Sequence, residues 1–194
     1  MSKSSAINHI YNPVREKPIQ AYFGQGLHTL GLLGWLLSQI GKADVFVSSY
    51  STSEAFLNGF LHLKEKELVK SSVLLLDHRA ARKTIKLERL MASAFDKVFL
   101  GNNHSKLLLL RGDDLSVSVI TSQNQTYGAR AESTIITTDR DVFRVLTEQF
   151  FEVCGKGAVE IDLRNGTGII TENRAACEAP SDTSTDLRPF DVEW

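Results

Sequence analysis

The sequence predicts an α/β protein built on a mixed sheet that is flanked by helices on both faces. Strand-like and helical segments alternate between about residue 27 and residue 100. The strand-like segments are apolar at successive positions, whereas a strand with one face in water would alternate between apolar and polar residues. After residue 105, two apolar segments separated by a Gly-Asp turn predict an antiparallel hairpin that joins the same sheet.

The first half of the chain supplies the alternating part. Helices are expected at 27–40, 54–70 and 79–95, and strands at 44–50, 73–77 and 97–100. The first helix carries Leu30, Leu33 and Leu37 on one stripe and ends at Gly41, a residue typical of helix C-caps. Residues 1–20 lack periodicity and predict an irregular lead-in.

The second half adds the hairpin and one more helix. Strands are expected at 106–110, 115–121 and 132–138, an amphipathic helix at 139–153, and short strands near Ile161 and Ile169. The residues after 170 are polar and acidic, which is typical of loosely held chain. We therefore expect a catalytic domain over 1–155, with the irregular lead-in, and a partly loosely ordered C-terminal extension over 156–194.

Composition limits the class of protein. The 194 residues are 42% hydrophobic and carry a formal net charge of -1, so only a local patch could attract an anionic substrate. The longest apolar run, 27–40, is too short and too polar to span a bilayer, and the N-terminus lacks the apolar segment of a signal peptide. We expect a cytoplasmic protein without a membrane partner. Its cysteines, Cys154 and Cys177, match no metal-ligand spacing.

The most informative residues surround the predicted hairpin. His104 and Lys106 are two residues apart at the entrance of one strand, so their side chains leave the same face. Ser122 and Asn124 repeat that spacing at the end of the partner strand, and Glu132 begins the next strand. Because the start of one hairpin strand lies beside the end of the other, these side chains are expected to converge.

The chemistry of this set suits a phosphodiester. An imidazole can attack phosphorus or transfer a proton, and Lys106 can neutralise the non-bridging oxygens. Ser122 and Asn124 can donate to the same oxygens, and Glu132 can orient the imidazole of His104. No metal or other cofactor is expected.

These residues resemble the signature of the phospholipase D superfamily, which is His-x-Lys followed by a short hairpin, Gly-Ser-x-Asn and a Glu. The resemblance covers more than half of the chain and implies a phospholipase D-like fold. Two positions depart from the fuller signature: Arg111 stands where an Asp is usual, with Asp113 or Asp114 as topological substitutes, and Thr121 replaces the Gly. The Asp is also missing in several nuclease-like branches, so its absence favours a nucleic-acid substrate.

Enzymes of this superfamily use two such motifs, one histidine as nucleophile and the other as general acid. The chain offers one, because the second His-x-Lys, at His62 and Lys64, lies in a charged helical stretch without a following Ser-x-Asn. The resemblance therefore implies a homodimer that brings two copies of His104 together.

A second signal is a row of cations on the helix expected at 79–95. Their spacing places them on one side of that helix, where they form either an ordinary solvated face or a surface for the phosphate backbone. The row consists of Arg79, Arg82, Lys83, Lys86 and Arg89.

Together these features predict a metal-independent phosphodiesterase, a hydrolase acting as a DNA endonuclease through a phosphohistidine, with RNA left open as a substrate. Because a promiscuous nuclease would attack its own genome, we expect restriction by DNA structure or by an accessory specificity subunit. The alternatives are a lipid phosphodiesterase of the same superfamily and a nucleic-acid-binding protein whose catalytic site has decayed.

Overall fold

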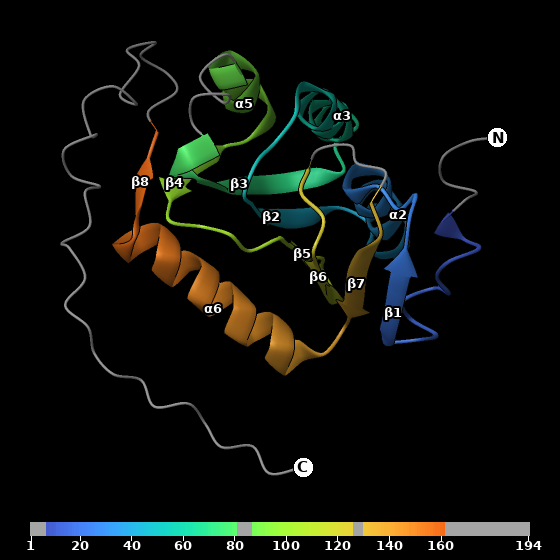
Figure 1. Ribbon diagram of the computed structural model, residues 1–194. Helices are drawn as coiled ribbons and strands as arrows, with labels where there is room; N and C mark the ends of the chain where they lie inside the picture. Colours follow the sequence, from blue (N-terminus) through green and yellow to red (C-terminus); the bar gives the residue numbers. More distant parts are fainter. Residues whose placement is uncertain (1–6, 81–86, 126–129, 162–194) are drawn as a thin grey trace.

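An eight-stranded mixed sheet forms the centre of the computed structural model, which describes residues 7–80, 87–125 and 130–161 (Figure 1). The strand order is β1-β7-β6-β5-β2-β3-β4-β8, and only the β2–β3 and β3–β4 pairs are parallel. The strands are β1 (Ile19–Gly24), β2 (Ala43–Ser49), β3 (Val69–Asp77), β4 (Lys97–Gly101), β5 (Leu107–Arg111), β6 (Ser116–Thr121), β7 (Glu132–Thr137) and β8 (Ala158–Glu160).

Helices cover both faces of this sheet, as the sequence predicts. One face carries α2 (Thr29–Ile40), α3 (Glu54–Glu65) and α5 (Glu88–Ala94), and the other carries α6 (Arg140–Lys156) (Figure 1). Each face has its own apolar cluster because strand side chains alternate between faces. Along β2, Val45 and Val47 join the cluster under α2 and α3, whereas Phe46 between them joins the cluster under α6. The predicted α/β class is confirmed.

Three expected elements differ from the structure. The irregular lead-in contains a strand, β1, which pairs antiparallel with β7 at the edge of the sheet. The helix expected at 54–70 ends at Glu65, because Glu67 adopts a left-handed backbone (φ 57°) and the chain enters β3 at Val69. The helix expected at 79–95 is a 3₁₀ turn, His78–Ala80, followed after residues 81–86 by the seven-residue α5.

The hairpin between β5 and β6 turns at Gly112, whose backbone N–H donates to Leu115 O at 3.0 Å. A Cβ at this position would lie 2.8 Å from the same oxygen, so the tight turn requires glycine. The hairpin predicted from the sequence is present, and a glycine makes its turn as expected.

The sheet continues past residue 155, because β8 pairs with β4 and Ile161 is buried. The small strand expected near Ile169 lies outside the described residues, as does Cys177. Cys154 is buried on α6, and burial raises the pKa of its thiol to about 11. No helix in the described ranges is both long and apolar enough to cross a bilayer.

One part of the sheet keeps exposed apolar side chains. The α6 helix packs against side chains of β2, β3, β4 and β5 and also contacts β6 and β8. On the same face, β6, β7 and β1 still expose four residues, here called the β1–β7–β6 patch. These residues are Ile19, Phe23, Ile120 and Ile135, with exposed fractions of 63%, 79%, 40% and 45%. Cross-strand pairing places Ile120 directly opposite Ile135, so the patch is contiguous across two strands.

Candidate active site

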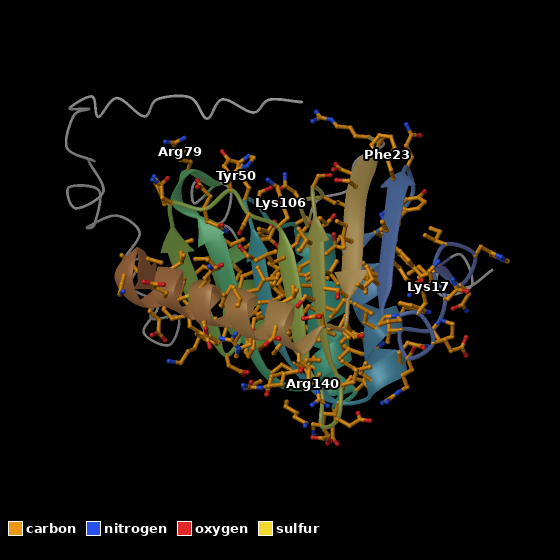
Figure 2. All side chains as sticks on the ribbon, turned by 90° about the horizontal axis from the view of Figure 1, so that it is seen from below. Lys17, Phe23, Tyr50, Arg79, Lys106 and Arg140 are labelled. Carbon is orange, nitrogen blue, oxygen red and sulfur yellow. The ribbon has the colours of Figure 1, made fainter. Side chains whose placement is uncertain are left out.

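The sequence-predicted catalytic residues gather at one edge of the sheet. The carboxyl ends of β2, β3, β4 and β6 meet there with the beginnings of β5 and β7. In Figure 2, Tyr50, Arg79, Lys106 and Phe23 lie along this edge, while Arg140 lies at the opposite end of the strands.

His104 and Lys106 are in direct contact, as their spacing predicts. Lys106 Nζ lies 3.2 Å from His104 Nδ1 and donates to His104 O at 2.7 Å. The ring of Tyr50, just after β2, lies 5.3 Å from the imidazole centroid. Burial lowers the pKa of Lys106, and the negative charge of Glu132 opposes that shift. The exposed imidazole therefore lies beside an ammonium ion that is partly desolvated.

Ser122 and Glu132 form a second pair at the same edge. Ser122 Oγ donates to Glu132 Oε2 and accepts from the backbone N–H of Ser133 at 3.0 Å. The sequence suggested instead that Glu132 orients the His104 imidazole, but no hydrogen bond joins these two side chains within the described residues. Glu132 instead interacts with two other residues of the site: it accepts the hydrogen bond of Ser122, and its negative charge acts on the ammonium group of Lys106.

Asn124 follows Ser122 in the loop after β6 and is half-buried. Its Oδ1 atom is buried and finds no hydrogen-bond partner in the part of the chain that the structure describes. An unpaired buried acceptor costs free energy, so this oxygen is poised for a donor that the described residues do not supply. Asn124 also lines a neighbouring cavity, which connects that cavity to the catalytic set.

The segment before His104 is fixed by Asn103, a residue that sequence reasoning did not single out. Asn103 is buried, and its Nδ2 donates to Ser48 Oγ at 2.9 Å and to two backbone carbonyls. Its Oδ1 accepts from the N–H and hydroxyl of Ser105, while its own N–H donates to Asp77 Oδ2 at 3.0 Å. His104 is thereby held between two residues anchored to β2 and β3.

Replacing Asn103 with alanine should lower the free energy of unfolding by about 1–3 kcal/mol, because the Ser48 hydroxyl and the Ser49 carbonyl each lose a buried partner. Urea denaturation measures this change. The matched control is Asn102→Ala at the exposed neighbouring position, which should shift stability by less than about 0.5 kcal/mol. Equal effects of the two substitutions would contradict the anchoring role.

The two departures from the fuller signature have their own contacts. Arg111 pairs with Asp44 at 3.0 Å and lies over the Phe46 ring, at the end of β5 remote from His104. The suggested substitutes are exposed in the hairpin, where Asp113 pairs with Lys70 and Asp114 with Arg15. Thr121 replaces the glycine of the Gly-Ser-x-Asn signature. Its Oγ1 lies 2.9 Å from Thr134 Oγ1 and accepts a hydrogen bond from the backbone N–H of Gln123.

The predicted row of cations is only partly described. Arg79 is exposed on the 3₁₀ turn at the catalytic edge, and its N–H donates to Asp77 Oδ1 at 2.7 Å. Arg89 is exposed on α5, a separate helix. Arg82, Lys83 and Lys86 lie outside the described residues. The expectation of one continuous helix beneath all five cations is therefore wrong, because Arg79 and Arg89 belong to different elements.

Two of the other histidines, His62 and His78, have local partners. His62 on α3 lies 3.6 Å from Glu65, and Nδ1 of His78 lies 3.1 Å from Gly101 O. Among residues 7–80, 87–125 and 130–161, no three His, Cys, Asp or Glu side chains are grouped so that they could hold a metal ion. The described polar cluster at the catalytic edge is thus composed of imidazole, ammonium, hydroxyl, amide and carboxylate groups.

Comparison of the fold with solved structures identifies its architecture. Nuc, a phospholipase D family member from Salmonella typhimurium, superposes with a TM-score of 0.56 at 18% identity over 74% of this chain and 98% of Nuc. NucT from Helicobacter pylori gives a TM-score of 0.54 at 16% identity over 74% of this chain and 99% of NucT. The chain has the phospholipase D fold.

A part of one larger protein also has a similar fold. Polyphosphate kinase from Porphyromonas gingivalis superposes with a TM-score of 0.53 at 12% identity, over 73% of this chain and 26% of the kinase. No family model matches the sequence, and no curated protein sequence matches it either. The assignment of the fold therefore comes from the three-dimensional arrangement of the strands and helices.

Proposed function

We propose that this protein is a metal-independent phosphodiesterase that cleaves DNA through a phosphohistidine, with one His104 from each subunit of a homodimer. The observation that carries the proposal is the contact of Lys106 Nζ with His104 Nδ1 beside the Ser122–Glu132 pair. This arrangement offers a nucleophile or acid, a fixed positive charge and hydrogen-bond donors within one small region.

The Lys106 contact also bears on protonation. An ammonium can only donate, so the imidazole in this contact accepts at Nδ1 and a neutral ring carries its proton at Nε2. A general acid needs instead an imidazolium, protonated at both nitrogens, so in that subunit Lys106 must donate to a phosphate oxygen and leave Nδ1 to hold a proton. The nucleophilic histidine needs a free lone pair at Nε2, which it has when Lys106 donates to a phosphate oxygen and Nδ1 holds the proton.

The proposed reaction has two displacements. Nε2 of one His104 attacks phosphorus, the P–O bond to the leaving group breaks, and the other His104 protonates the departing oxygen. Water then attacks the phosphorus of the phosphohistidine and loses a proton to the second imidazole. The P–N bond breaks, and the first His104 leaves as a neutral imidazole. Lys106 stabilises the negative charge on the non-bridging oxygens during both steps, the Asn124 amide donates to those oxygens, and Ser122 donates to them once its hydroxyl turns away from Glu132.

Two features of the structure support a second subunit. The described chain places a single His-x-Lys pair at the catalytic edge. The β1–β7–β6 patch begins at that edge, because Phe23 pairs with Ser133, next to Glu132 on β7. An exposed apolar surface of this kind is typical of an interface between proteins.

Mixed dimers provide the test of the shared site. Wild-type and His104→Ala subunits, carrying different tags, are unfolded and refolded together at equal concentrations. If each dimer needs both imidazoles, the mixture should retain about one quarter of the wild-type DNA cleavage, because only that share of dimers is fully wild-type. Retention of one half would mean that each subunit acts alone and would overturn the shared site.

The positions of Arg79 and Arg89 favour DNA over lipid as the phosphodiester. Both guanidinium groups are exposed, and Arg79 lies on the same edge as Lys106 (Figure 2). An exposed arginine beside a phosphodiesterase site, such as Arg79, suits the repeated charges of a nucleic-acid backbone. An accessory specificity subunit stays part of the proposal as one way to restrict cleavage.

A further inference from the structure

A cavity of about 430 Å³ lies next to the catalytic residues, between the beginnings of α2 and α3 and the loop after β6. Its walls are mainly apolar and include Ile7, Ile10, Leu30 and Phe56. Its polar side is formed by the loop that contains Asn124. Small-molecule sites typically have volumes of about 300–1,000 Å³, so this cavity can hold a compact ring system.

Two glutamines on either side of Asn124 line the cavity and differ in their bonding. The amide of Gln123 is paired at both atoms, because Nε2 donates to Leu27 O at 2.6 Å and Oε1 accepts from Thr29 Oγ1 at 3.1 Å. The amide of Gln125 is paired at neither atom within the described residues, although Gln125 is only 5% exposed.

The backbone of Gln125 is nevertheless fixed. Its carbonyl accepts from Ser53 Oγ at 2.8 Å, and its N–H donates to Ser49 Oγ at 3.4 Å. Ser53 is also the N-cap of α3, where its hydroxyl accepts from the N–H of Phe56. The backbone at Gln125 is therefore anchored, and its buried amide, whose donor and acceptor lack partners among the described residues, lies in the wall of an apolar cavity. Such a group is costly unless a ligand pairs with it.

We propose that this cavity is a nucleobase subsite in which the Gln125 amide, buried in the cavity wall, turns toward the base beside the scissile phosphate and hydrogen-bonds its edge. The proposal rests on the proposed function and names the part of the substrate that sits next to the reacting phosphorus. A primary amide offers a donor and an acceptor side by side, which is the pattern that glutamine uses to bind adenine. The walls would pack against the faces of the ring.

The position of Asn124 connects this subsite to the chemistry. Asn124 belongs to the catalytic set and also lines the cavity, so a nucleotide can place its phosphate at one and its base at the other. The fatty-acid chain of a phospholipid would fill the apolar walls but would leave the Gln125 amide and Asn124 Oδ1 unpaired. The polar side of the cavity therefore favours a base.

A base can enter this cavity only when it is not stacked in a duplex. The enzyme should accordingly bind single-stranded DNA, or DNA with an extruded nucleotide, more tightly than a regular duplex. The need for an unstacked base would therefore explain how DNA structure limits cleavage, as expected from the sequence.

Binding by full-length protein carrying His104→Ala tests the subsite without cleavage. Fluorescence anisotropy is measured with short labelled single strands in which one position at a time is abasic. One abasic position should weaken binding by about tenfold, because a glutamine–base pair and its packing are lost. Adding Gln125→Met, or Ala55→Trp at the exposed cavity rim, should reduce that penalty to within about twofold.

The matched control is Asn58→Trp, which adds the same ring at an exposed position of α3 outside the cavity lining. It should leave the abasic penalty unchanged, and circular dichroism confirms that each variant is folded. Equal binding of all abasic strands would overturn the subsite, as would a penalty that persists in both Gln125→Met and Ala55→Trp. Competition by dihexanoylphosphatidylcholine that Ala55→Trp abolishes would identify an acyl-chain pocket and would also overturn it.

Failure of the subsite is separable from failure of the proposed function. Wild-type protein that cleaves DNA but shows no position-dependent abasic penalty would disprove the base subsite alone. Protein with a clear abasic penalty that never cleaves DNA would support the subsite and disprove the proposed catalysis.

Discussion

Replacing His104 with alanine should abolish DNA cleavage, lowering the rate by at least about 10³-fold, because the variant loses both the nucleophile and the general acid. The wild-type protein should cleave in excess EDTA, since the proposed reaction uses an imidazole where many phosphodiesterases use metal-activated water. Plasmid nicking and cleavage of a labelled oligonucleotide measure the rate. The structure should be retained, because His104 is exposed and contributes no core packing.

The chain contains a matched control for this substitution. His62 forms the same His-x-Lys spacing with Lys64, but it lies on the surface of α3 beside Glu65. His62→Ala should leave the cleavage rate within about twofold of wild type, since surface substitutions away from a site have small effects. Loss of cleavage in EDTA would exclude the metal-independent reaction, and full activity of His104→Ala would exclude a phosphohistidine at this residue.

The convergence of the candidate catalytic residues at one edge of the sheet could be predicted because it depends on short-range rules. Alternation along β5 and β6 places Lys106 and Ser122 at adjoining strand ends, and the Gly-Asp turn fixes the register between them. Neither rule requires knowledge of the rest of the fold. The contact between His104 and Lys106 was predictable for the same reason.

Residues that hold the site from a distance could not be predicted in this way. Asn103 is polar and lies between two strands, so its sequence context resembles an ordinary loop. Its burial arises only because β2 and β3 end beside it and offer Ser48 and Asp77 as partners. Asn103 comes directly before His104, and this adjacency was the one available signal.

The missed strand has a similar explanation. The β1 sequence, Ile-Gln-Ala-Tyr-Phe-Gly, contains a buried Gln20 and an exposed Phe23, so it lacks the apolar pattern of the central strands. Gln20 is satisfied by the backbone N–H and carbonyl of Asn12 and by the carbonyl of Lys17. Its pairing partner, β7, lies more than 100 residues away in sequence. The pattern of residues within one segment cannot predict that the segment pairs with a strand so far away in the sequence.

Ile135→Glu should convert the proposed dimer into monomers and abolish cleavage together with it. Ile135 is 45% exposed in the middle of the β1–β7–β6 patch, opposite Ala21 on one side and Ile120 on the other. In a two-fold interface the substitution occurs twice, so two carboxylates would be buried in apolar surroundings. The dissociation constant of the dimer should rise by about 100-fold or more, because burying an unpaired charge costs several kcal/mol.

Sedimentation velocity measures the dimer, and the same samples are assayed for DNA cleavage. The matched control is Val159→Glu, which places the same charge at a residue that is 38% exposed on β8, at the other end of the sheet. This variant should stay dimeric and active. Because each imidazole depends on the other, activity should follow the dimer fraction across a dilution series of the wild-type protein. An active monomer would mean that a single His104 serves as both nucleophile and acid, and the second imidazole would then be unnecessary.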